Sequence, residues 1–119
     1  MRPDGLTFNA DGVANLPDGM KMLVRSITLG IDEYYDLPRG YGIGEIYLGS
    51  DGYVKFIVTN SGAVTLILAT SSTRNIEVTD TGAASDDLCI FDNGTTARIQ
   101  NRDNFSNISI RLVYFYEEY

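Results

Sequence analysis

The chain has 119 residues and a formal net charge of −7, and hydrophobic residues, with tyrosine counted among them, make up 44% of it. That length suits one domain, and the acidic balance disfavours binding to nucleic acid or anionic membrane, because both need clustered Lys and Arg. The sequence contains no histidine, which excludes a Ser–His–Asp triad, a Cys–His dyad and a His-ligated metal site within one chain.

Residues 1–19 differ in composition from the rest of the chain. They contain turn signals, such as Pro3-Asp4-Gly5, and only isolated apolar side chains. We expect an extended arm here, which either lies on its own domain or reaches a neighbouring molecule. Because the opening residues are polar, we also expect no secretion signal. The single Cys89 is consistent with synthesis in a reducing compartment.

Short blocks of apolar and β-branched residues, separated by turns, occupy residues 20–119. Strands are expected over residues 20–29, 43–48, 53–59, 63–70, 76–79, 88–91, 95–100 and 107–116. The tight turns Ser50-Asp51-Gly52 and Asn60-Ser61-Gly62 join three consecutive blocks, which predicts an antiparallel meander. Residues 32–40 are expected to form a polar loop and residues 80–87 an acidic loop.

About eight short strands without a helical period predict an all-β domain over residues 20–119. A single sheet cannot bury its apolar face alone, so we expect a two-sheet antiparallel sandwich. A jelly-roll-like topology is the first choice, and an immunoglobulin-like sandwich is the second.

Three motifs suggest chemistry, and each has a structural explanation. The run from Gly40 to Glu45 lacks the third glycine of a dinucleotide fingerprint and opens a strand. Carboxylates in 32–36 and 80–87 lack the spacing of a calcium loop and suit solvated turns. Cys89 has no cationic neighbour in sequence and is expected to be an inert buried thiol. We therefore expect no enzyme, cofactor or metal, with a small hydrolase using Asp86 or Asp87 as a third hypothesis.

Tyrosine is the remaining unusual feature, because its large amphipathic side chain suits protein interfaces and sugar stacking. The candidate ligand- or receptor-binding residues lie in and beside the polar loop, and they are Tyr34, Tyr35 and Tyr41. The candidate subunit or capsid contacts lie in the arm and the aromatic C-terminal stretch, and they are Leu6, Phe8, Leu16, Tyr114, Phe115, Tyr116 and Tyr119.

Several motifs between Tyr41 and Tyr116 carry a resemblance to a known family. They are Gly42-Ile43-Gly44-Glu45-Ile46-Tyr47-Leu48, Gly62-Ala63-Val64-Thr65-Leu66-Ile67, Thr79-Asp80-Thr81, Leu88-Cys89-Ile90-Phe91-Asp92-Asn93-Gly94-Thr95, Ile99-Gln100-Asn101-Arg102 and a terminal strand ending in aromatic residues. This stretch resembles the small β domains of tailed-bacteriophage virion proteins, of the capsid decoration, head-fibre and fibre-tip type. The resemblance implies a homotrimer on the virion and no catalysis.

Two hypotheses of function follow. The first is a non-enzymatic structural virion protein, made in the host cytoplasm, that decorates or projects from the capsid as a homo-oligomer and contacts other virion proteins such as the major capsid protein. The alternative is a carbohydrate- or receptor-binding β-sandwich module, at a fibre tip or free, that binds a host-surface glycan. Neither involves nucleic acid or a membrane.

Overall fold

Strands provide nearly all the regular structure of the described residues. The computed structural model describes residues 7–49, 52–59, 63–71, 76–77, 88–103 and 106–118. Its strands are β1 (Val13–Asn15), β2 (Met20–Leu29), β3 (Tyr34–Asp36), β4 (Tyr41–Tyr47), β5 (Gly52–Val58), β6 (Val64–Ser71), β7 (Ile76–Glu77), β8 (Leu88–Asp92), β9 (Ala97–Asn101) and β10 (Ile108–Glu117). One 3-10 turn, Pro17–Gly19, connects β1 to β2. The predicted strand over 20–29 coincides with β2.

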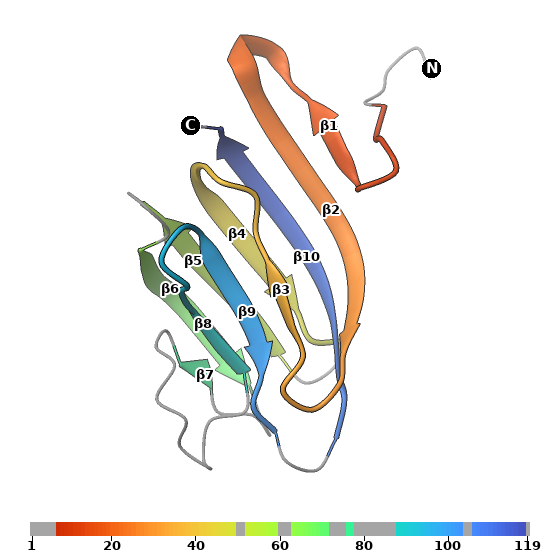
Figure 1. The fold of residues 1–119 in the computed structure, drawn as a ribbon, viewed down its shortest axis with the longest axis vertical. Helices are drawn as coiled ribbons and strands as arrows, with labels where there is room; N and C mark the ends of the chain where they lie inside the picture. The colour runs from red at the N-terminus through yellow and green to blue at the C-terminus, as the bar shows by residue number, and fades with distance from the viewer. Residues whose placement is uncertain are drawn as a thin grey trace.

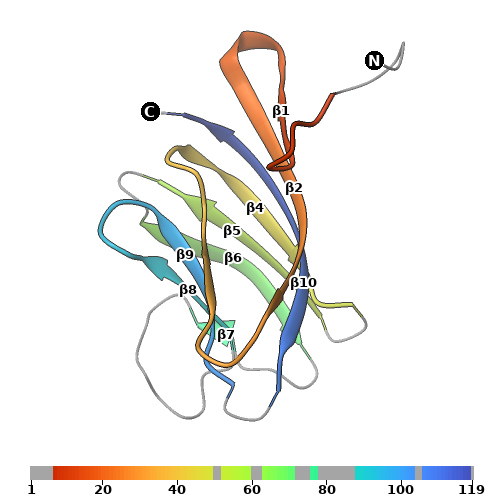
Figure 2. The same cartoon turned by 45° about the vertical axis from the view of Figure 1, so that its right-hand side comes forward.

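The strands form two sheets that pack face to face. The larger has six strands in the order β1-β2-β10-β4-β5-β6, and the smaller has four in the order β3-β9-β8-β7. β10 runs through the larger sheet between β2 and β4, and the β1–β2 hairpin projects beyond the smaller sheet (Figures 1 and 2). The predicted all-β, two-sheet sandwich is confirmed, and the described ranges contain no α-helix.

The winding of the chain is jelly-roll-like in one half of the molecule. β2 pairs with β10 in one sheet, and β3 pairs with β9 in the other. The segments β2–β3 and β9–β10 therefore form an antiparallel ribbon that passes from sheet to sheet, as in a jelly roll. In the other half, β4, β5 and β6 pair in chain order, which confirms the predicted meander.

The core lies between the sheets and is filled by alternate residues of each strand. β10 alone contributes five buried side chains, Ile108, Ile110, Leu112, Tyr114 and Tyr116. Phe56 of β5 lies in the same core, and its ring fills the space where Gly44 of β4 has no side chain. The glycine-rich run from Gly40 to Glu45 thus enters a strand, as expected from the sequence, and does not form a phosphate-binding loop before a helix.

Three details differ from, or add to, the sequence-based expectation. The polar loop over 32–40 contains β3, a short strand whose central residue Tyr35 packs on the core. β7 pairs with β8 in parallel, so the smaller sheet is mixed and not purely antiparallel. Part of the N-terminal arm lies on its own domain, because β1 pairs with β2 and buries Ala14.

Candidate assembly surface

The outer face of the larger sheet, which points away from the smaller sheet, carries apolar side chains outside the core. On β10, Phe115 alternates with the buried residues and is 38% exposed. The strand register places it beside Met22 of β2 and Ile43 of β4, and Ile43 lies beside Ile57 of β5. Four neighbouring strands therefore contribute one apolar row across the sheet.

The side chains of Met20 and Tyr41 widen this row at one end of the sheet. Tyr41 and Ile43 are 44% and 43% exposed, and Met20 lies beside them. A shallow hollow of about 480 Å³ with mostly apolar walls lies among these side chains. We define the apolar face as the surface formed by Met20, Met22, Tyr41, Ile43, Ile57 and Phe115.

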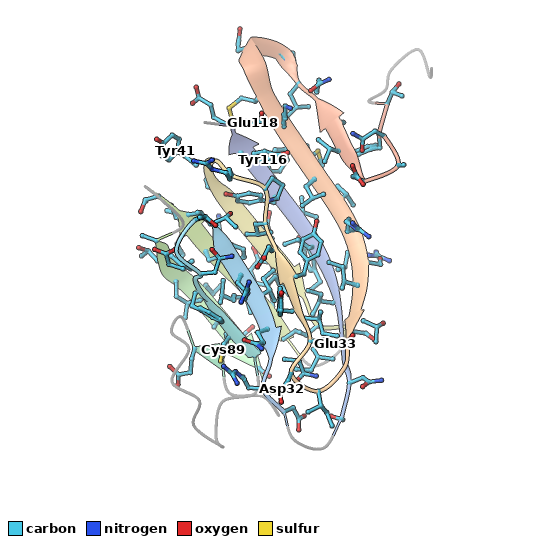
Figure 3. The ribbon with its side chains drawn as sticks, in the orientation of Figure 1. Asp32, Glu33, Tyr41, Cys89, Tyr116 and Glu118 are labelled. Carbon is cyan, nitrogen blue, oxygen red and sulfur yellow. The ribbon has the colours of Figure 1, made fainter. Side chains whose placement is uncertain are left out.

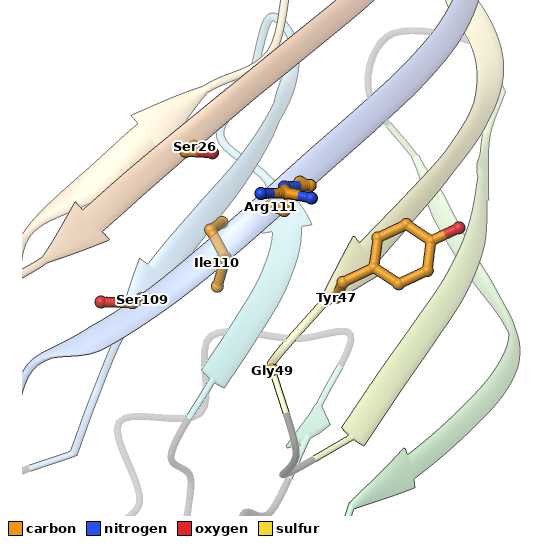
Figure 4. Close-up of a pocket in the computed structure, with 6 residues that line it drawn as sticks. All are labelled: Ser26, Tyr47, Gly49, Ser109, Ile110 and Arg111. Atoms are coloured by element: carbon orange, nitrogen blue, oxygen red, sulfur yellow. The ribbon is translucent and has the colours of Figure 1, made fainter.

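A polar row borders the apolar face further along the same strands. Arg111 of β10 lies between Ser26 of β2 and Tyr47 of β4 (Figure 4). These residues line a second shallow hollow of about 510 Å³. Arg111 makes no ion pair within the described ranges, so its charge faces solvent at the border of the apolar face.

A carboxylate bridges two tyrosines within this border. Glu45 of β4 accepts hydrogen bonds from the hydroxyls of Tyr47, at 3.1 Å, and of Tyr53 on β5. The hydrogen bond to Glu45 stabilises the neutral phenol, which raises the pKa of Tyr53 to about 12 and also raises the pKa of Tyr47. The two rings lie 5.2 Å apart, so this pair is held in place beside the apolar face.

The outer face of the smaller sheet is different, because its polar side chains bind one another. Arg98 of β9 donates to both carboxylate oxygens of Asp36 on β3, at 2.7 and 3.1 Å. The Arg98 guanidinium also lies 3.7 Å from the ring centre of Tyr34. The hydrogen bond from Arg98 lowers the pKa of Asp36, because it stabilises the ionised carboxylate.

The three tyrosines predicted to bind a ligand do not share one surface. Tyr34 lies on the outer face of the smaller sheet beneath Arg98, and Tyr35 points to the interior. Tyr41 lies on the outer face of the larger sheet, on the other side of the sandwich (Figure 3). Neighbouring strand residues point to opposite faces, and β3 and β4 belong to different sheets, so the three side chains are separated; ligand binding by any of them stays a prediction.

The predicted contact residues have three different outcomes. Tyr114 and Tyr116 are 0% and 2% exposed, so their side chains belong to the core of the single chain, and a subunit or capsid contact through them stays a prediction. Phe115 is part of the apolar face, and Phe8 is 37% exposed in the arm. Leu16 is partly buried beside the 3-10 turn. Leu6 and Tyr119 lie outside the described residues.

The described ranges offer few side chains that could bind a metal ion or take part in catalysis. No group of three or more Cys, Asp or Glu side chains is placed to hold a metal ion in that part of the chain. Cys89 is fully buried in β8, as predicted, and Asp86 and Asp87 lie outside the described residues. No helix among the described residues has the length and apolar character to cross a membrane.

Comparison with family models, curated proteins and solved structures finds no match to this chain. The apolar face therefore has to be interpreted from its own geometry. Sequence reasoning identified Phe115 but not Ile43, Ile57 or Met20 as its neighbours. The available signal was the occurrence of apolar residues on both faces of the strand over 20–29, which the structure explains by one buried face and one exposed apolar face.

Proposed function

We propose that this protein is a non-enzymatic structural component of a tailed-bacteriophage virion, which decorates or projects from the capsid as a homotrimer. The apolar face is its contact surface with a second copy. The virion context is supported by the sequence resemblance alone, whereas self-association is supported by the physical chemistry of the larger sheet.

The observation that carries the assembly proposal is the exposed apolar row across the outer face of the larger sheet. Tyr41, Ile43 and Phe115 are each more than a third exposed and adjoin one another. Contiguous exposed apolar patches of this kind mark interaction surfaces, because burying them removes apolar area from water at about 25 cal/mol per Å². Aromatic residues and methionine, which this face contains, are enriched in protein interfaces.

A second copy of the chain suits this face for two reasons. The border carries both signs of charge, because Glu45 lies beside Lys55 and Arg111 lies on the neighbouring strand β10, so two copies can meet despite their net negative charge. A closed ring of three also needs a second, different patch on each copy. The edge strand β6 of the same sheet provides it, because Ile67 and Leu68 are 49% and 48% exposed.

A pair of matched substitutions tests the assembly. Ile43→Glu places a charge in the apolar face, whereas Ile31→Glu places the same charge at an isoleucine that is 48% exposed outside it. Light scattering after size exclusion should give three times the 13.1 kDa monomer mass for the wild type and Ile31→Glu, and the monomer mass for Ile43→Glu. A wild-type monomer at all concentrations, or equal effects of both substitutions, contradicts the proposed contact.

The β6 patch is tested in the same way. Leu68→Glu should also give monomers if the ring joins the apolar face of one copy to β6 of the next. A dimer that responds to Ile43→Glu but not to Leu68→Glu would instead show a two-fold contact between two apolar faces.

The virion context needs a separate experiment. The purified protein should cosediment with capsids assembled from the major capsid protein of the phage that encodes it. An absence of binding to such capsids contradicts the virion proposal and leaves the assembly result unaffected.

A further inference from the structure

A polar groove of about 380 Å³ lies between the two sheets, on the side of the molecule where the β1–β2 hairpin projects beyond the smaller sheet. Its walls come from β1, β2 and β10 of the larger sheet, from the segment before β1, and from β3 of the smaller sheet. The volume is within the range of small-molecule sites, about 300–1,000 Å³. The groove opens on the side of β10 opposite to the apolar face, so the two surfaces do not overlap.

An unpartnered tyrosine hydroxyl lies in the floor of this groove. Tyr116 is 2% exposed, and its ring stacks on Tyr114 with centroids 5.0 Å apart. Its hydroxyl makes no hydrogen bond within the described part of the chain. Lys21, Glu118 and Tyr35 lie close enough to interact with it electrostatically. Figure 3 shows Tyr116 and Glu118 at the C-terminal end of β10, where this strand pairs with the beginning of β2. Among the described residues, this hydroxyl is not one of the enclosed side-chain polar atoms that lack a partner, so it is open to the groove and a ligand there can hydrogen-bond to it.

The groove is lined by two cations, Lys21 and Arg25, and three carboxylates, Asp11, Asp36 and Glu118, of which the last two are paired. Lys21 and Glu118 form an ion pair at 3.0 Å. Asp36 accepts two hydrogen bonds from Arg98 outside the groove. Arg25 lies 5.4 Å from the ring centre of Tyr35 and has no carboxylate partner in the described ranges, so its N–H donors are available. The groove thus offers separate donors and acceptors without a strong field of one sign.

The charges, donors and acceptors that line the groove indicate which class of ligand it can bind. An inorganic anion or a cation would need an excess of opposite charge, which the compensated pairs do not provide. A sugar ring presents several hydroxyls that donate and accept, together with apolar C–H groups that pack on an aromatic wall. Both requirements are met by side chains already in place.

We propose that the groove between β2, β3 and β10 binds a neutral mono- or disaccharide. The Tyr116 hydroxyl and the Arg25 guanidinium hydrogen-bond to the sugar hydroxyls, and Tyr35 forms the wall against which the ring packs. The proposal does not depend on trimer formation, because the apolar face and the groove lie on opposite sides of the larger sheet.

Binding is tested on the full chain with defined sugars. Glucose, galactose, N-acetylglucosamine and their disaccharides are titrated while amide shifts are followed by NMR, and an array of neutral, sialylated and sulfated glycans gives the selectivity. We expect saturable shifts at Arg25, Tyr35 and Tyr116 with at least one neutral sugar. No saturable shift with any of them, or binding only to sialylated or sulfated glycans, overturns the proposal.

Variants of Tyr116 and Arg25, with a control at Tyr114, distinguish binding in the groove from binding elsewhere. Tyr116→Phe removes only the hydroxyl and should weaken binding about three- to tenfold, the value of one hydrogen bond. Tyr114→Phe is the matched control, because the hydroxyl of Tyr114 is directed at the Gly40 carbonyl, 3.4 Å away, and the residue does not line the groove. Arg25→Gln should weaken binding further. Unchanged affinity in both Tyr116→Phe and Arg25→Gln, with unaltered thermal unfolding, overturns the assignment of the site.

Discussion

The two outer faces of the sandwich use their side chains differently. On the smaller sheet, Arg98, Asp36 and Tyr34 satisfy one another through an ion pair and a cation–π contact. On the larger sheet, Phe115 and Ile43 adjoin in register but remain exposed to solvent. The first face is complete in the single chain, whereas the second leaves apolar area that only another surface can cover.

The contrast between the two faces indicates where a partner is expected to bind. A face whose charges are already paired gains little from a partner, because those pairs must be desolvated or broken. A face with exposed apolar side chains gains free energy from burial without losing existing bonds. Both sheets share one core, so the contrast arises only from the residues that alternate with the core residues.

The strongest test compares neighbouring residues on β10. Tyr114→Ala removes a fully buried aromatic side chain and should lower the free energy of unfolding by about 3–5 kcal/mol. Phe115→Ala, one residue away on the apolar face, should cost less than about 1 kcal/mol in the monomer. Urea unfolding measured at low protein concentration gives both values. Equal losses would show that Phe115 serves the fold and not a partner.

A second test breaks the network on the smaller sheet. Arg98→Ala removes the ion pair to Asp36 and the cation–π contact to Tyr34, and should cost about 1 kcal/mol of stability. Arg111→Ala on the larger sheet is the control and should change stability by less than about 0.5 kcal/mol, since Arg111 makes no ion pair in the described residues. A loss of the same size from both variants contradicts the contrast between the faces.

The ion pair between Arg98 and Asp36 predicts that the unfolding free energy decreases at low pH. The folded-state pKa of Asp36 is lowered from 3.8, so its contribution is present above pH 3.8 and disappears as the pH falls through the lowered value. Because the ion pair is partly exposed, its contribution to stability is small, about 0.2–1 kcal/mol, as is typical of such pairs. Asp36→Asn should remove this acid-dependent part of the unfolding free energy. An identical pH profile for the variant and the wild type would contradict the role of the pair.

The smallest effect is spectroscopic and concerns the border of the apolar face. The hydrogen bond from Tyr53 to Glu45 raises the pKa of Tyr53 to about 12, so any stabilisation by this bond is present below pH 10.0 and disappears as the pH rises through about 12. Glu45→Gln should return the pKa of Tyr53 toward 10.0, as measured by ultraviolet titration of the phenolate. An unchanged titration would show that the bond does not persist in solution.

Most of the fold could be predicted from the sequence, because alternation and tight turns are local signals. They located β2, the β4–β6 meander and the aromatic strand β10. β3 was missed because a three-residue polar strand has no pattern of its own and exists through its pairing with β9. The direction of β7 was missed because parallel pairing depends on the path of a whole segment.

The candidate sites were predicted less well, because they depend on the register between distant strands. The run Tyr114-Phe115-Tyr116 was treated as one aromatic contact, whereas the pleat places its members on opposite faces. The neighbours of Phe115 come from β2, β4 and β5, and no local pattern in the sequence determines which residues of these strands lie side by side.

The position of β10 between β2 and β4 has a consequence for how the protein folds. Until β10 inserts, the larger sheet consists of two separate pieces, β1–β2 and β4–β6, with unpaired edges at β2 and β4. The pairing of Leu29 with Ile108 closes a long stretch of chain, and such non-local pairing slows folding to milliseconds or longer. During that interval the open edges can capture strands from other molecules, so the yield of refolding should fall as protein concentration rises.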